Sequence, residues 1–271
     1  MSQKLIETSH GAIALDDNGG DGVPLLMLHA NSCCKEEFVF QTRALDDKRR
    51  VIALDFPGHG ASSDAIDARR TYNISGYADA VLEVLDKLGV GRFAVLGHSL
   101  GGHVSLELIA RGGNVAGAMI FGTPPIPNSL EGLQLGFIPS PEMAYTGNPV
   151  LTEEEARGVV RLALGLSAER DIFYTSAVQR TDGRARQYML EAVMDGQDGD
   201  QREVVATSTV PLAVVNGADD PVVNLDYVDS LNYRNLWTPL PLRVADAGHG
   251  VHWQQHAVFN ELLQGFLQTL D

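Results

Sequence analysis

The stretch FAVLGHSLGGH, Phe93 to His103, decides the fold of this chain. A buried-type apolar run ends at Gly97, and Ser99 then stands between Gly97 and Gly101. The following residues, LGGHVSLELIARG, have the apolar spacing of a helix. When Gly-x-Ser-x-Gly connects a strand to a helix, the turn is so tight that side chains on either side of the serine would clash. This explains the two glycines. We therefore expect Ser99 to project from the carboxyl edge of a sheet, at the positive end of a helix.

The rest of the chain alternates strand-like and helix-like segments around this turn. Continuous apolarity at 23–30, 51–54 and 93–98 is typical of strands that are covered on both faces. Helical spacing follows in 74–90, where Gly89 supplies a stop, and in 258–270. Further strands are predicted at 4–8 and 11–17, which form a hairpin, and at 116–122, 210–217 and 241–246. This order predicts a mostly parallel sheet with helices on both faces.

The alternation breaks between residues 124 and 209. This segment lacks a strong apolar strand and holds helix-like stretches such as LTEEEARGVVRLALGL and GRARQYMLEAVMDG. It is too long for a structureless loop. We therefore predict a core made of residues 1–123 and 210–271, with a helical cap inserted at 124–209.

A serine hydroxyl needs a base, and the base needs an orienting acid. In a fold with this serine turn, the acid and then the histidine follow the serine along the chain. His249 comes after a late strand and is the predicted base. The acid is predicted to be Asp220, just before Pro221, with Asp219 as the alternative.

Two N–H groups are required where negative charge develops on a reacting oxygen. The backbone of Leu100, next to Ser99, is one predicted donor. The backbone of Asn31, in the loop after the strand at 23–30, is the other. The Asn31 side chain can instead stabilise that loop.

Composition excludes several classes of partner. The 271 residues carry a formal charge of −15, which repels nucleic acid and anionic membranes. No apolar run is long enough to span a bilayer, and the first residues lack the apolar stretch of a secretory signal. The two cysteines, Cys33 and Cys34, are adjacent and cannot staple distant segments, so a cytoplasmic location is expected.

No metal or other cofactor is expected. His249, His252 and His256 have a suggestive spacing, but His249 is already needed as a base. Cys33 and Cys34 are expected to be small packing residues, since Ser99 occupies the exposed turn. His103, on the helix after Ser99, is expected to be packed or hydrogen-bonded in the core.

The motifs LHANS, LDFPGHGASS, GHSLGGH, NGADDPVV and DAGH resemble those of the α/β-hydrolase superfamily over essentially the whole chain. The stretches DAIDARRTYNISGYADA, GTPPIP and RTDGRAR are most similar to the N-acyl-homoserine lactonases of that fold. The chain departs from that group at Ala30, at His98 and at Val159–Val160, where glycine, tryptophan and tyrosine are expected. The resemblance implies an eight-stranded sheet and no cofactor.

The resemblance also implies a serine hydrolase that opens a lactone ring, with a small ester or lactone as its partner. The alternatives are a carboxylesterase, another ester or carbon–carbon bond hydrolase, a cofactor-less dioxygenase and a non-catalytic receptor. The dioxygenases need a planar heteroaromatic pocket, and no aromatic cluster adjoins Ser99. The candidate substrate-binding residues, each of which can equally be core, are His29, His98, Phe121, Phe137, Met143 and Tyr145.

Overall fold

The computed structural model describes residues 2–197 and 199–270. Its described residues form a sheet of eight strands in the order β1-β2-β4-β3-β5-β6-β7-β8. The strands are β1 (Ser2–Thr8), β2 (Gly11–Asp17), β3 (Leu25–Leu28), β4 (Val51–Leu54), β5 (Phe93–His98), β6 (Val115–Phe121), β7 (Leu212–Gly217) and β8 (Leu242–Val244). The hairpin β1–β2 pairs antiparallel, β2 pairs antiparallel with β4, and the other neighbours are parallel. The predicted mostly parallel, eight-stranded sheet is confirmed.

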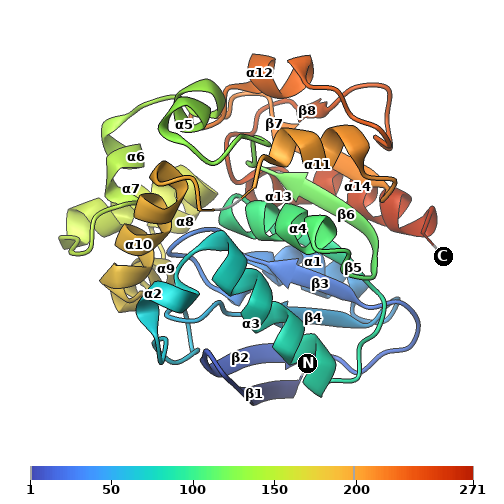
Figure 1. Ribbon diagram of the computed structural model, residues 1–271, viewed down its shortest axis with the longest axis horizontal. Helices are drawn as coiled ribbons and strands as arrows, with labels where there is room; N and C mark the ends of the chain where they lie inside the picture. Colours follow the sequence, from blue (N-terminus) through green and yellow to red (C-terminus); the bar gives the residue numbers. More distant parts are fainter. Residues whose placement is uncertain (1, 198, 271) are drawn as a thin grey trace.

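Helices cover both faces of the sheet. The helices of the core are η1 (Lys35–Phe38), α1 (Val39–Leu45), α2 (Ala68–Thr71), α3 (Ile74–Lys87), α4 (Leu100–Ala110), α12 (Leu225–Ser230), α13 (Val251–Gln254) and α14 (His256–Gln268). In Figure 1, α3 and α4 lie in front of the sheet and α14 lies behind it. Asn73 caps the N-terminus of helix α3, where its side chain accepts the Gly76 N–H. After the helix the chain turns away at Gly89, which has φ of 67°.

The strand side chains alternate between two apolar cores. In β3, Leu26 and Leu28 pack on the face covered by α3 and α4, while Leu25 and Met27 pack on the face covered by α14. All four side chains are fully buried. A strand buried on both faces has no polar positions to offer, which explains its continuous apolar sequence.

The segment between β6 and β7 is helical. Its helices are α5 (Leu130–Gly136), α6 (Pro141–Tyr145), α7 (Glu153–Leu164), α8 (Leu166–Glu169), α9 (Ile172–Arg180), α10 (Gly183–Met194) and α11 (Gln201–Thr207). Most of them gather at the left of the view in Figure 1. Helix α7 begins with a capping box between Thr152 and Glu155. The separate behaviour of this segment as a cap stays a prediction.

Arg186 of α10 binds the helical segment to the loop after β3. Its guanidinium donates to the carbonyl of Asn148 at 2.6 Å, to that of Val178 at 3.2 Å and to the hydroxyl of Ser32 at 3.3 Å. The side chain is 2% exposed. The bonds to Asn148 and Val178 lie within the helical segment, and the bond to Ser32 ties this segment to the loop after β3.

Among the described residues, no helix has both the length and the apolar character needed to cross a membrane.

Candidate active site

Ser99 lies at the sharp turn from β5 into α4. Its φ of 52° and ψ of −112° lie in a region that non-glycine residues rarely occupy. A Cβ at Gly101 would overlap the carbonyl of Leu28 in β3, and one at Gly97 would overlap the carbonyl of Gly101. Both glycines are therefore required by close backbone approach, as the sequence pattern indicates.

His249 and Asp220 lie next to each other. The Nδ1 of His249 is 3.0 Å from Oδ2 and 3.2 Å from Oδ1 of Asp220. The Asp220 carboxylate also accepts the N–H groups of Val222 at 2.8 Å and Val223 at 3.1 Å. Burial raises the pKa of Asp220, but His249 and these hydrogen bonds outweigh it, so the pKa lies below its ordinary value. Asp219 is exposed on the same loop.

Gly122, just beyond β6, provides the space for the His249 ring. It has φ of 60°, and a Cβ at this position would lie 2.7 Å from Cε1 of His249. The end of β6 also adjoins the serine turn, because Ser99 N–H donates to the carbonyl of Phe121 at 2.9 Å. The strand end thus places the histidine ring and the serine at one edge of the sheet.

A cavity opens at this edge, and Ser99 and His249 both line it. Most of the remaining lining is apolar and comes from the helical segment, including Val159, Leu162 and Val193. A largely apolar pocket with a few convergent polar groups is the usual form of a small-molecule site.

Leu100 and Asn31 also line the cavity. Leu100 is the first residue of α4, so its N–H has no partner within the helix. The Asn31 N–H donates to none of the described residues. Its side chain donates to the Thr146 carbonyl at 2.9 Å. The side chain therefore holds the loop against α6 while the backbone N–H stays available, and the two predicted roles of Asn31 are compatible.

The candidate substrate-binding residues divide into two groups. Phe137 and Met143 line the cavity. The structure places the other candidates outside the lining, which corrects the expectation for His29, His98, Phe121 and Tyr145. His29 is fully buried, and its Nε2 accepts the Phe56 N–H at 2.9 Å. Tyr145 packs against the buried cluster that includes Val159 and Val160 of α7.

His98 and Phe121 end adjacent strands and face the interior below the serine turn. Their rings are stacked, with centroids 4.6 Å apart and an interplanar angle of 10°. Both residues are fully buried. A residue next to Ser99 in an extended strand points away from it, which explains why His98 is not part of the cavity.

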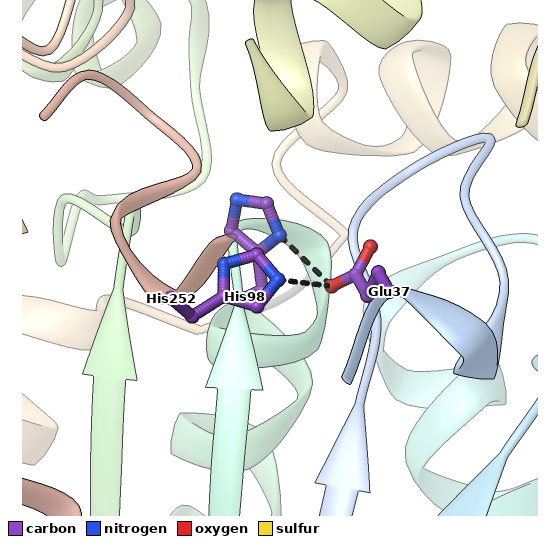
Figure 2. A group of neighbouring side chains, drawn as sticks. All are labelled: Glu37, His98 and His252. Atoms are coloured by element: carbon purple, nitrogen blue, oxygen red, sulfur yellow. Dashed lines mark hydrogen bonds and ion pairs between the residues drawn. The ribbon is translucent and has the colours of Figure 1, made fainter. Parts of the chain in front are cut away.

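Glu37 and two histidines form a buried polar cluster that the sequence did not indicate (Figure 2). Oε1 of Glu37 is 2.9 Å from Nδ1 of His98 and 3.9 Å from Nε2 of His252. The same carboxylate accepts the Ala30 N–H at 3.3 Å. It therefore contacts the loop after β3, the strand before Ser99 and the helix after His249.

Burial raises the pKa of Glu37 to about 7, against the opposing effect of His252. Burial also lowers the pKa of His252 to about 3. Glutamate and histidine are side-chain types that bind transition metals, and one ligand atom from each of these three residues lies within 4.8 Å of the others. A direct hydrogen bond joins Glu37 to His98, whereas neither ring nitrogen of His252 has a hydrogen-bond partner among the described residues.

Both cysteines are free and buried. Burial raises the pKa of each thiol well above its ordinary value, with Glu37 adding to the shift at Cys33 and Glu36 at Cys34. A thiol held in its neutral form is a poor nucleophile, in agreement with the packing role expected for both residues.

Comparison with known proteins gives a consistent family. The model of the alpha/beta hydrolase family matches residues 25–262. The crystal structure of the N-acyl homoserine lactonase AidH complexed with N-butanoyl homoserine superposes with a TM-score of 0.95. The two sequences are 40% identical, and the alignment covers 100% of this chain and 97% of that one.

Curated relatives are more distant. A 2-hydroxy-6-oxononadienedioate/2-hydroxy-6-oxononatrienedioate hydrolase of Pseudomonas sp is 25% identical, covering 98% of this chain and 96% of the relative. The dihydrolipoyllysine-residue acetyltransferase component of the acetoin cleaving system of Pseudomonas putida is 28% identical over 92% of this chain. The chain spans 65% of the length of that component.

Proposed function

The chain belongs to the alpha/beta hydrolase family, and from this premise we propose that it is a hydrolase of ester bonds that opens the lactone ring of N-acyl homoserine lactones. One observation carries the proposal: Ser99 and His249 line one apolar cavity, and Asp220 holds the ring of His249. The 40% identity to a lactonase complexed with N-butanoyl homoserine supports the substrate class.

In this proposal Ser99 Oγ attacks the lactone carbonyl while His249 Nε2 takes its proton. Asp220 accepts from Nδ1, so it fixes the tautomer and stabilises the imidazolium that forms. The N–H groups of Leu100 and Asn31 hold the oxyanion.

The ring C–O bond then breaks, and the leaving alkoxide takes the proton from His249. Because the substrate is cyclic, this alcohol stays attached to the acyl group on Ser99. Water, activated by His249, cleaves the acyl-enzyme and releases the N-acyl homoserine. The apolar lining, including Val159, Leu162 and Phe137, would hold the acyl chain.

Two further features belong to the proposal. The enzyme works without a metal, since the serine, histidine and aspartate supply nucleophile, base and orienting acid. We also place it in the cytoplasm, because its two cysteines are adjacent and free, as is typical of a reducing compartment.

A second candidate is hydrolysis of an oxononadienedioate, the compound for which one hydrolase relative is named. A dienedioate carries two carboxylates, and recognition of such groups ordinarily uses arginine or lysine. The described lining of the cavity contains neither. The cavity therefore suits an uncharged lactone with an alkyl chain better than a dicarboxylate.

A panel of lactones tests the proposal. N-acyl homoserine lactones of several chain lengths and a simple p-nitrophenyl ester are incubated with the enzyme, and release of titratable acid is followed. Faster hydrolysis of the acyl lactones supports the lactonase. Hydrolysis of the p-nitrophenyl ester alone indicates a general esterase, and a fluorophosphonate that fails to label Ser99 indicates a non-catalytic protein.

A further inference from the structure

Two polar side chains line the cavity without a role in the chemistry above. These are His103 of α4 and Asn128, in the loop before α5. Thr146 also lines the cavity, but its hydroxyl donates to the Met143 carbonyl and its own carbonyl accepts from Asn31. His103 and Asn128 are therefore the polar groups left for recognition in the described lining.

Gln201 of α11 fixes the tautomer of His103. The Gln201 Nε2 donates to the backbone carbonyl of His103 at 3.3 Å, so its Oε1 must be the atom that lies 2.7 Å from His103 Nδ1. An amide oxygen only accepts, so Nδ1 carries the proton. Burial lowers the pKa of His103 to about 4, although the bond to Gln201 opposes this. The ring is thus neutral, and Nε2 bears a lone pair.

That lone pair is available to a ligand. The Nε2 atom of His103 bonds to none of the described residues. Unlike Nε2 of His98, it is not closed off by packing. Since the ring lines the cavity, Nε2 is a hydrogen-bond acceptor presented to whatever the cavity binds.

Asn128 supplies the complementary group. Its side-chain nitrogen and oxygen both lack a partner among the described residues, and the residue is only 6% exposed. Packing closes off both atoms, as it does Nε2 of His98, so the side chain must rotate to meet a ligand in the cavity. Because an unsatisfied buried amide is costly, a ligand that bonds to it would favour that rotation. The pair thus offers one fixed acceptor and one amide.

We propose that His103 Nε2 accepts the amide N–H of an N-acyl homoserine lactone and that Asn128, turned toward the cavity, donates to the adjacent acyl carbonyl. This inference rests on the proposed function and assigns its specificity to the amide. The amide nitrogen is bonded to the carbon next to the lactone carbonyl, close to the atom that Ser99 attacks. His103 lies one helical turn beyond Ser99, and side chains at this spacing have Cβ atoms about 5–6 Å apart. The distance suits an amide beside the reacting carbonyl.

The test compares N-hexanoyl homoserine lactone with its analogue in which a methylene replaces the amide nitrogen. Both keep the lactone and the acyl carbonyl, and only the first has an N–H. We expect the wild type to prefer the amide by about 10-fold or more in kcat/KM, because a site built to bond an N–H is left unsatisfied by the analogue.

The variant His103→Asn isolates the contact. Its amide nitrogen can replace Nδ1 as donor to Gln201, but nothing replaces Nε2, so the preference should fall to about 1. His103→Gln places an amide oxygen near the Nε2 position and should restore part of the preference. Thermal unfolding of each variant checks that the fold is kept.

Asn128→Leu is the second variant. It should lower kcat/KM for both lactones by the same factor, since both carry the carbonyl. A wild type that hydrolyses both lactones equally well overturns the inference and leaves the lactonase proposal intact. The inference is also overturned if the preference for the amide lactone survives His103→Asn, or if that preference changes in Asn128→Leu. A wild type that opens neither lactone contradicts the proposed function itself. The wild-type comparison needs no variant, so it remains decisive even where His103→Asn fails to fold.

Discussion

Nδ1 of His98 and Oε1 of Glu37 lie 2.9 Å apart, and both side chains are fully enclosed by protein. This contact joins η1 to the last residue of β5, directly before Ser99. The Ala30 N–H shares the same carboxylate oxygen at 3.3 Å. A buried carboxyl thus braces two of the segments that carry the proposed catalytic groups, and its protonation affects how stable the fold is.

We predict that stability falls as pH rises through the range in which Glu37 titrates. The folded-state pKa of about 7 lies above the ordinary value of 4.5. Below 4.5 both states hold the proton, and the full stabilisation is present. Between 4.5 and 7 the unfolded chain loses its proton first, so folding becomes less favourable. At 1.36 kcal/mol per pKa unit, this amounts to an upper value of about 3 kcal/mol.

Urea unfolding at about pH 5 and about pH 8 measures this effect. Glu37→Gln cannot titrate, so the loss of stability between the two pH values should be clearly smaller than in the wild type. Glu7→Gln, which removes an exposed carboxylate on β1, controls for the loss of one negative charge. Equal pH dependence in Glu37→Gln and the wild type would contradict the raised pKa.

Asp220→Asn should lose activity by roughly 10³–10⁴-fold in kcat with little change in KM. The amide oxygen can still accept the Val222 and Val223 N–H groups, which leaves the NH₂ group facing His249 Nδ1. His249 then carries its proton on Nε2, which is the wrong tautomer for a base that must accept the serine proton there. The matched control is Asp219→Asn on the exposed side of the same loop, which should change kcat by less than about 10-fold. The opposite order of damage would transfer the role of the acid to Asp219.

Gly101→Ala should destabilise the protein severely or prevent folding. The new Cβ would overlap the carbonyl oxygen of Leu28, so the backbone of β3 or of α4 would have to shift. Gly91→Ala is the matched control, since Gly91 is exposed and no described atom beyond its two chain neighbours lies within 4 Å of the position that its new Cβ would take. Thermal unfolding compares the two, and similar melting temperatures would show that the turn is less tight than described.

Much of the candidate site can be predicted from sequence because its signals are local. The elbow around Ser99 follows from two glycines placed between a strand and a helix. Asp220 and His249 follow from the rule that residues after parallel strands meet at one edge of the sheet. The contact between these two side chains is thus expected from their places after β7 and β8.

Other parts depend on contacts that a sequence pattern does not encode. Glu37 reads as one more acidic residue in a polar loop, and its partner His98 is 61 residues away. His98 and His29 look like site residues because they adjoin the loops, but both are fully buried and lie outside the cavity lining. The sequence predicts a core position for His103, whereas its availability to a ligand depends on Gln201, 98 residues further on.

Removal of metal should leave the enzyme active. We expect that dialysis against a chelator, with metal content checked by mass spectrometry, lowers lactone hydrolysis by less than about 2-fold, because the proposed chemistry uses only protein side chains. Loss of activity that zinc restores would contradict this mechanism, and the cluster of Glu37, His98 and His252 would then be the first site to test by substitution.

The central claim is that Ser99 opens a lactone ring, and mass spectrometry of N-hexanoyl homoserine lactone tests it most directly. The substrate is incubated with the wild type and with Ser99→Ala, after thermal unfolding has shown that the variant keeps its fold. We predict that the wild type converts the lactone to a product heavier by one water molecule and that Ser99→Ala leaves it unchanged beyond the rate of spontaneous hydrolysis. Ring opening by Ser99→Ala at the wild-type rate, or none by the wild type, would contradict the account.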